Sequence, residues 1–239
     1  MIKLTTLFLF ILIILIAAIL QSSTGFGFSI ISTPFMLIIL EPREAVQISL
    51  LLSLLISFAL VGKVKKDVDK GILKRFTIGS IVGLPLGMFI FMILDVAWLK
   101  IGIGILILLL TALLVLNIRI KQTHLKDVFV GSMSGALTTS IGMSGPPILL
   151  YFSGIETSKE KLRGTTLMYY ILICFMSLIT QIFIAGTTLN VWILSLLSLP
   201  VISLGMFFGE ILFNKINQYV FRKITYGLLL FTGVYLLLQ

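Results

Sequence analysis

Long apolar runs separated by short polar segments make up most of the chain. A helix that crosses the hydrocarbon core of a bilayer needs about 20 mainly apolar residues. Six runs are close to this length, near residues 45–62, 76–94, 97–117, 164–185, 190–209 and 219–238. The pattern therefore predicts six membrane-spanning helices and an all-α integral membrane protein.

Two further apolar stretches are each interrupted by a short polar segment that contains glycine. The first break is residues 21–29 (QSSTGFGFS), and the second is residues 138–147 (TTSIGMSGPP). Glycine permits positive φ and close backbone contact, while Pro146 suits the first turn of a helix, where no amide hydrogen is required. Each stretch thus predicts a broken helix. In the first half, the two arms of the broken helix are expected near 4–22 and 28–40. In the second half, the first arm is expected near 127–140.

The two breaks belong to an internal repeat. Three features recur in the same order in both halves: Gly25 matches Gly142, 86–89 (LGMF) matches 204–207 (LGMF), and 100–104 matches 223–227. This predicts a first membrane repeat at 1–118, a basic linker at 119–126 and a second repeat at 127–239. Each repeat is a broken helix followed by three full spans. The first twenty residues are expected to belong to the first repeat rather than to a cleaved signal peptide.

The basic residues predict how the chain is oriented. All but three of the 18 Lys and Arg residues fall in four segments, at 63–75, 119–126, 155–163 and 211–223. By the positive-inside rule these segments face the cytoplasm, which places both termini outside. Residues 3–43 then begin and end outside, whereas 126–155 begin and end inside.

Each broken helix is therefore either two full spans or a re-entrant hairpin. In the second half the arms, of roughly 13 and 10 residues, would reach only ~20 and ~15 Å, which favours re-entry there. With three full crossings per unit, the second unit lies upside down relative to the first. The sequence thus predicts an inverted-topology repeat, a common design of transporters, with the substrate site at the paired breaks.

Composition and charge agree with a membrane protein and exclude several functions. Hydrophobic residues make up 59% of the chain and charged residues 11%. The net charge of +9 is explained by orientation, so no nucleic-acid partner is expected. Cys174 and His124 are each the only residue of their kind, and no pair of carboxylates lies inside a span. We therefore expect no enzyme, no metal site and no cofactor.

The breaks themselves predict an anion site. A non-helical turn inside a membrane is tolerated only where it is buried in protein or lines a watery cavity, so the two turns are expected to meet near the midplane. The N-terminus of the helix after each turn carries free amide groups and a partial positive charge, which favour an anion. The candidate substrate-binding residues are Ser23, Thr24, Gly25, Phe26, Gly27, Ser29, Gln47, Ser140, Gly142, Ser144, Gly145, Pro146, Arg163 and Thr165.

Arg163 has two interpretations. It is either a cytoplasmic helix end that marks topology, or a deeper side chain whose guanidinium reaches the anion. The coupling ion is open as well, because no buried proton relay is visible. The alternatives are proton coupling, through Glu210 or through the substrate, sodium coupling, and passive uniport. The direction of transport and the oligomeric state are likewise open.

Taken together, the breaks at 24–27 (TGFG) and 142–147 (GMSGPP), with Arg163-Gly164-Thr165 after the second, resemble the sulfite exporter TauE/SafE family over nearly the whole chain. The resemblance implies a secondary transporter of sulfite, thiosulfate or organic sulfonates in the cell (inner) membrane. The chain departs from the family pattern in having Phe28-Ser29 where more glycine is usual, and Ser144 in a comparable place. A passive anion channel, or a carrier of another small oxyanion or carboxylate, is the alternative.

Overall fold

The computed structural model describes residues 4–93 and 121–215, and, in the segments after them, 101–102, 104–105, 108–109, 111–112, 217, 220, 223, 226–227, 230–231 and 234. The expected spans 97–117 and 219–238, and the match of 100–104 with 223–227, lie largely outside these residues.

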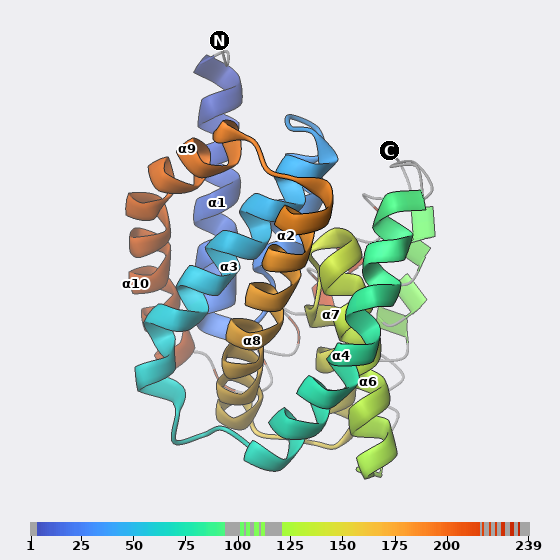
Figure 1. The fold of residues 1–239 in the computed structure, drawn as a ribbon. Helices are drawn as coiled ribbons and strands as arrows, with labels where there is room; N and C mark the ends of the chain where they lie inside the picture. Colours follow the sequence, from blue (N-terminus) through green and yellow to red (C-terminus); the bar gives the residue numbers. More distant parts are fainter. Residues whose placement is uncertain are drawn as a thin grey trace.

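All regular structure in the described residues is helical (Figure 1). The helices are α1 (Leu4–Thr24), α2 (Phe28–Met36), α3 (Pro42–Val64), α4 (Lys70–Ile93), α6 (His124–Ile141), α7 (Gly145–Gly154), α8 (Lys159–Ala185), α9 (Leu189–Leu197) and α10 (Leu199–Lys215). In this part of the chain α1, α3, α4 and α8 are long and apolar enough to cross a membrane, and the bent pair α9–α10 would make a fifth span. The all-α membrane fold is confirmed.

The expected span at 190–209 is two helices rather than one. α9 and α10 meet at an angle of 46°. Pro200 lies in the first turn of α10, where its missing amide hydrogen and its ring prevent a continuous helix with α9.

Both predicted broken helices are present, and each has one long and one short arm. α6 begins at His124 because Thr123 caps it, accepting a hydrogen bond from the Lys126 amide. With 18 residues, α6 is about 27 Å long, so this arm is longer than expected and nearly crosses the core. The short arms α2 and α7 have 9 and 10 residues.

Each long arm packs along a helix of the other half. α1 lies along α10, and α6 lies along α4. The glycines of the two LGMF motifs make these contacts: a Cβ on Gly87 would lie 2.8 Å from Ala136 Cα, and a Cβ on Gly205 would lie 2.5 Å from Ala18 Cβ. Small residues at such positions let helix backbones approach closely in a membrane.

These paired contacts support the predicted repeat. In Figure 1, α1 and α10 descend from the end that carries the N-terminus, whereas α4 and α6 rise towards it. The two sets of contacts are thus equivalent but opposite in direction, as an inverted repeat requires. The division into two inverted units, and how they lie relative to a bilayer, stay a prediction.

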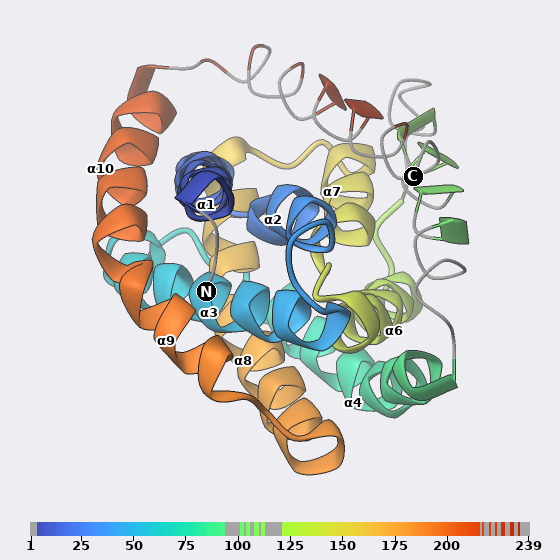
Figure 2. The same cartoon turned by 90° about the horizontal axis from the view of Figure 1, so that it is seen from above.

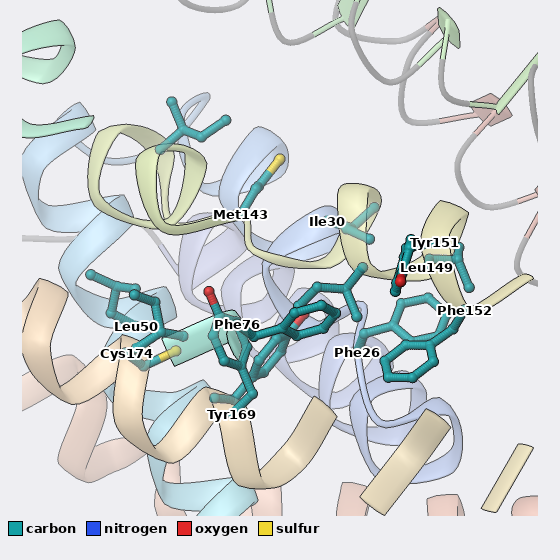
Figure 3. Close-up of a cluster of buried hydrophobic side chains, with 14 of the residues drawn as sticks. Phe26, Ile30, Leu50, Phe76, Met143, Leu149, Tyr151, Phe152, Tyr169 and Cys174 are labelled. Carbon is teal, nitrogen blue, oxygen red and sulfur yellow. The ribbon is translucent and has the colours of Figure 1, made fainter. Parts of the chain in front are cut away.

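The short arms lie inside the bundle. Seen from above, α2 and α7 are side by side between α1 and α6 (Figure 2). One of two buried apolar clusters surrounds them and joins side chains from both halves, including Phe26 and Ile30 from the first and Met143 and Leu149 from the second (Figure 3). The two breaks are therefore held within protein rather than exposed to lipid.

Candidate functional site

The first break is a tight turn seated against α8. Gly25 donates its amide to Gln21 O at 2.8 Å, which ends α1, and Gly27 is the N-cap of α2. Both glycines have positive φ, at 84° and 104°. A Cβ on Gly25 would lie only 2.6 Å from Arg163 Cα, so a larger residue at this position would push the turn away from α8.

The second break makes the corresponding contact with α3. Gly142 adopts a left-handed conformation and its amide donates to Thr138 O at 2.8 Å, which ends α6 in an αL motif, while the Met143 amide donates to Leu137 O at 3.2 Å. A Cβ on Gly142 would lie 3.4 Å from Val46 Cγ1. Each break is thus seated against the early part of the first full helix of the other half.

The two breaks also contact each other. A Cβ on Gly145, the first residue of α7, would lie 3.1 Å from Ile30 Cδ1 and 3.6 Å from Phe26 Cβ. Ser134 Oγ donates to Ser144 O at 2.8 Å and holds the second turn to α6. Of the candidate residues, the structure therefore brings Phe26 of the first break next to Gly145 of the second.

Most hydroxyl groups at the breaks bond to their own helices. Ser23 and Thr24 donate to Leu20 O at 3.1 and 2.7 Å, and Ser140 donates to Ala136 O at 2.8 Å. A hydroxyl has a single hydrogen, so these groups have no hydrogen left for a ligand in this arrangement. Ser29 is buried in the first turn of α2.

The two helix N-termini differ in the number of amide donors that they offer. The first turn of any helix leaves its amides without intrahelical partners, and in α2 these are the amides of Gly27, Phe28, Ser29 and Ile30. In α7 two of the corresponding positions are Pro146 and Pro147, which have no amide hydrogen. Backbone donation to an anion is therefore stronger at the first break.

Arg163 is buried at the first break and is ion-paired. It lies one turn into α8 with 4% of its surface exposed. Its Nε donates to Ser22 O at 2.8 Å, its Nη2 bonds to the Glu210 carboxylate of α10, and its guanidinium stacks on Phe213 at 4.2 Å. Glu210 also binds Lys63 at 3.2 Å. Arg163 therefore joins α8, α10 and the first break.

Gln47 and Thr165 make contacts elsewhere. Gln47 Nε2 donates to Gly186 O at 2.8 Å, at the end of α8. Thr165 Oγ1 accepts from the Asp69 amide at 2.9 Å and so anchors the loop between α3 and α4. Burial opposes ionisation of Asp69 in that loop. The hydrogen bonds that Asp69 accepts from Lys161 and from the Ile72 amide nevertheless hold its pKa below the usual range.

Sequence reasoning missed a line of polar side chains along one face of α8. Its members are all buried and are spaced three, four or seven residues apart, at Arg163, Thr166, Tyr170, Ser177 and Gln181. This is helical spacing, so a search for polar periodicity inside the apolar run would have found the face.

Asp127, in the first turn of α6, is fully buried and is bound by Arg75 at 2.6 Å. Among the described residues no group of three or more His, Cys, Asp or Glu side chains could hold a metal ion.

Paired broken helices that meet inside a bundle of membrane-spanning helices define this protein as a multi-pass membrane protein of the transporter type. Comparison with family models gives a match to Sulfite exporter TauE/SafE over residues 10–236. The chain belongs to this family, which confirms the resemblance seen in the sequence. No curated protein and no solved structure matches the chain.

Proposed function

We propose that this protein is a secondary transporter that carries a small sulfur-containing anion, namely sulfite, thiosulfate or a short organic sulfonate. The observation that carries the proposal is the contact of the two breaks around Phe26 and Gly145, which brings the N-termini of α2 and α7 together. Two partial positive charges, each about half an elementary charge, then act on the same small space. Membership of a sulfite exporter family supports the sulfur anion as the substrate class.

The burial of the breaks supports a carrier over a passive channel. Phe26, Met143 and Tyr170 are 3%, 1% and 1% exposed, so these side chains leave little room for a water-filled path at the breaks. A channel requires such a path in its conducting state. A carrier needs one only on alternate sides of its bound substrate.

The proposal includes the orientation in the cell membrane. By the positive-inside rule, Lys63 at the end of α3 and Lys65 and Lys66 in the α3–α4 loop would face the cytoplasm. The site near Phe26 and Gly145 would then lie towards the bilayer midplane, reached from the two sides in turn.

Uptake into proteoliposomes tests the function. Radiolabelled sulfite, thiosulfate, sulfate and a short sulfonate are offered with and without imposed proton and sodium gradients. The proposal predicts saturable uptake of at least one sulfur anion other than sulfate, and its dependence on a gradient identifies the coupling ion. Flux that rises linearly with concentration would indicate a channel, and no flux of any of these anions into liposomes with folded protein would refute the proposal.

A further inference from the structure

Two buried hydroxyl groups at the second break have no hydrogen-bond partner. Within the part of the chain that the structure describes, Ser144 Oγ and the Tyr170 hydroxyl are among the few such side-chain atoms. Both side chains are 1% exposed. Buried polar groups in native proteins are nearly always bonded, so an orphaned pair at one place calls for a partner that is not part of the chain.

The two hydroxyl groups lie at the N-terminus of α7. Ser144 is the N-cap of this helix, yet its side chain does not form the capping hydrogen bond that serine usually makes there. Tyr170 reaches the same place from α8: a Cβ on Gly145 would lie 3.1 Å from its hydroxyl oxygen. The Tyr170 hydroxyl and Ser144 are near enough to act as hydrogen-bonding neighbours, although neither side chain completes a bond of good geometry with any described residue. Gly145, which has no side chain, lies directly beside the Tyr170 hydroxyl.

The sequence of α7 explains why hydroxyl groups are needed. Pro146 and Pro147 remove two amide donors from the first turn, although the partial positive charge of the helix end remains. An anion at this end must then take its hydrogen bonds from side chains. Ser144 and Tyr170 are placed to supply them, whereas the nearby Ser140 is bonded to its own helix.

We propose that Ser144 and Tyr170 are the substrate-binding hydroxyl donors of the second half, and that they hold oxygen atoms of the anion against the end of α7. This proposal rests on the proposed function. The first half would bind the same anion through backbone amides of α2, so the two halves recognise it with different donors. The internal repeat alone would not have predicted Tyr170 or a pair of hydroxyl donors. At the equivalent positions, Phe26 and Gly27 precede α2, whereas Met143 and Ser144 precede α7.

The neighbouring tyrosine provides a matched control. Tyr169 is buried like Tyr170, but its hydroxyl shares a 2.7 Å hydrogen bond with Ser80 Oγ on α4. Tyr169→Phe therefore removes a structural hydrogen bond to another helix, whereas Tyr170→Phe removes a hydroxyl that completes no bond of good geometry with the described residues. We therefore expect Tyr169→Phe to lower stability without changing anion binding, and Tyr170→Phe to weaken anion binding without lowering stability.

The test measures equilibrium binding of radiolabelled sulfite and thiosulfate to the full-length protein in nanodiscs, together with its melting temperature without ligand. A hydrogen bond to a charged group is strong enough that Tyr170→Phe and Ser144→Ala should each raise the Kd about 10- to 100-fold. The melting temperature of Tyr170→Phe should be unchanged or higher. Tyr169→Phe should lower the melting temperature and leave the Kd within about twofold.

The outcomes separate this proposal from the proposed function. If the wild type binds one of the anions and both Tyr170→Phe and Ser144→Ala bind it with the wild-type Kd, the hydroxyl assignment is wrong and the transporter function stands. If the wild type binds neither anion, the proposed function fails and the hydroxyl assignment fails with it.

Discussion

Replacing Gly25 by alanine should loosen the first break from α8, and Gly27→Ala is the matched control. Both glycines have positive φ, at 84° and 104°. Alanine in such a conformation costs about 1–2 kcal/mol, and this cost is no smaller at Gly27. The positions differ in their surroundings: the new Cβ would lie 2.6 Å from Arg163 Cα at position 25, but 3.7 Å from the nearest atom, Leu20 Cβ, at position 27.

The excess cost at Gly25 comes from the contact with backbone. A separation of 2.6 Å is shorter than van der Waals contact, and the α8 backbone cannot rotate away as a side chain would. Forcing an extra group into a packed interior costs about 1–3 kcal/mol. Gly25→Ala should therefore lower the free energy of unfolding by about 2–5 kcal/mol, and Gly27→Ala by about 1–2 kcal/mol.

The assay is unfolding in mixed micelles of a mild detergent and SDS, followed by tryptophan fluorescence or circular dichroism. Uptake of the transported sulfur anion is measured separately, after the same variants are reconstituted into proteoliposomes, and we expect Gly25→Ala to lose more activity than Gly27→Ala. Equal destabilisation by the two substitutions would refute the reasoning, because it would show that contact between the first break and α8 contributes nothing.

Two further predictions use matched pairs of the same kind. Glu210→Gln should lower the free energy of unfolding by about 2–4 kcal/mol because it leaves the buried Arg163 without its carboxylate. Lys63→Met removes an exposed partner of the same carboxylate and should lower the free energy of unfolding by less than about 1 kcal/mol. Equal losses for the two variants in SDS unfolding would contradict this prediction. Gly87→Ala should separate α4 from α6 and destabilise the protein, while Gly62→Ala, whose Cβ would meet nothing within 4 Å, should be neutral or stabilising by up to about 1 kcal/mol. A Gly87→Ala protein as stable as Gly62→Ala would show that this close contact is unnecessary.

The sequence predicted the features that depend on short-range chemistry. The breaks, the helices on either side of them and Pro146 in the first turn of α7 follow from the conformations that glycine and proline allow. The equivalence of the LGMF glycines was visible as a repeat, and the structure shows a shared role, since Gly87 and Gly205 both let a broken helix approach. Helix ends were less accurate because α6 starts at a cap, Thr123, outside its apolar run.

The details of the site could not be predicted because they depend on contacts between distant segments. Hydroxyl residues at the breaks looked like ligands, but Ser23, Thr24 and Ser140 bond to carbonyls of their own helices. The pairing of Arg163 with Glu210 joins residues that are 47 positions apart. Tyr170 gave no signal as a single residue in an apolar run, and only its place beside Gly145 shows its chemistry.

Uptake of the transported sulfur anion by Gly145→Leu beside the wild type tests the central claim most directly, namely that the anion binds where the two breaks meet. A leucine at this position would force the two breaks apart, because Ile30 Cδ1 and the Tyr170 hydroxyl oxygen each lie only 3.1 Å from the first added carbon. Gly62→Leu, at a position with nothing within 4 Å, is the control for insertion and folding. We expect saturable uptake by the wild type and by Gly62→Leu and none by a correctly inserted Gly145→Leu protein, whereas wild-type uptake by Gly145→Leu would contradict the account.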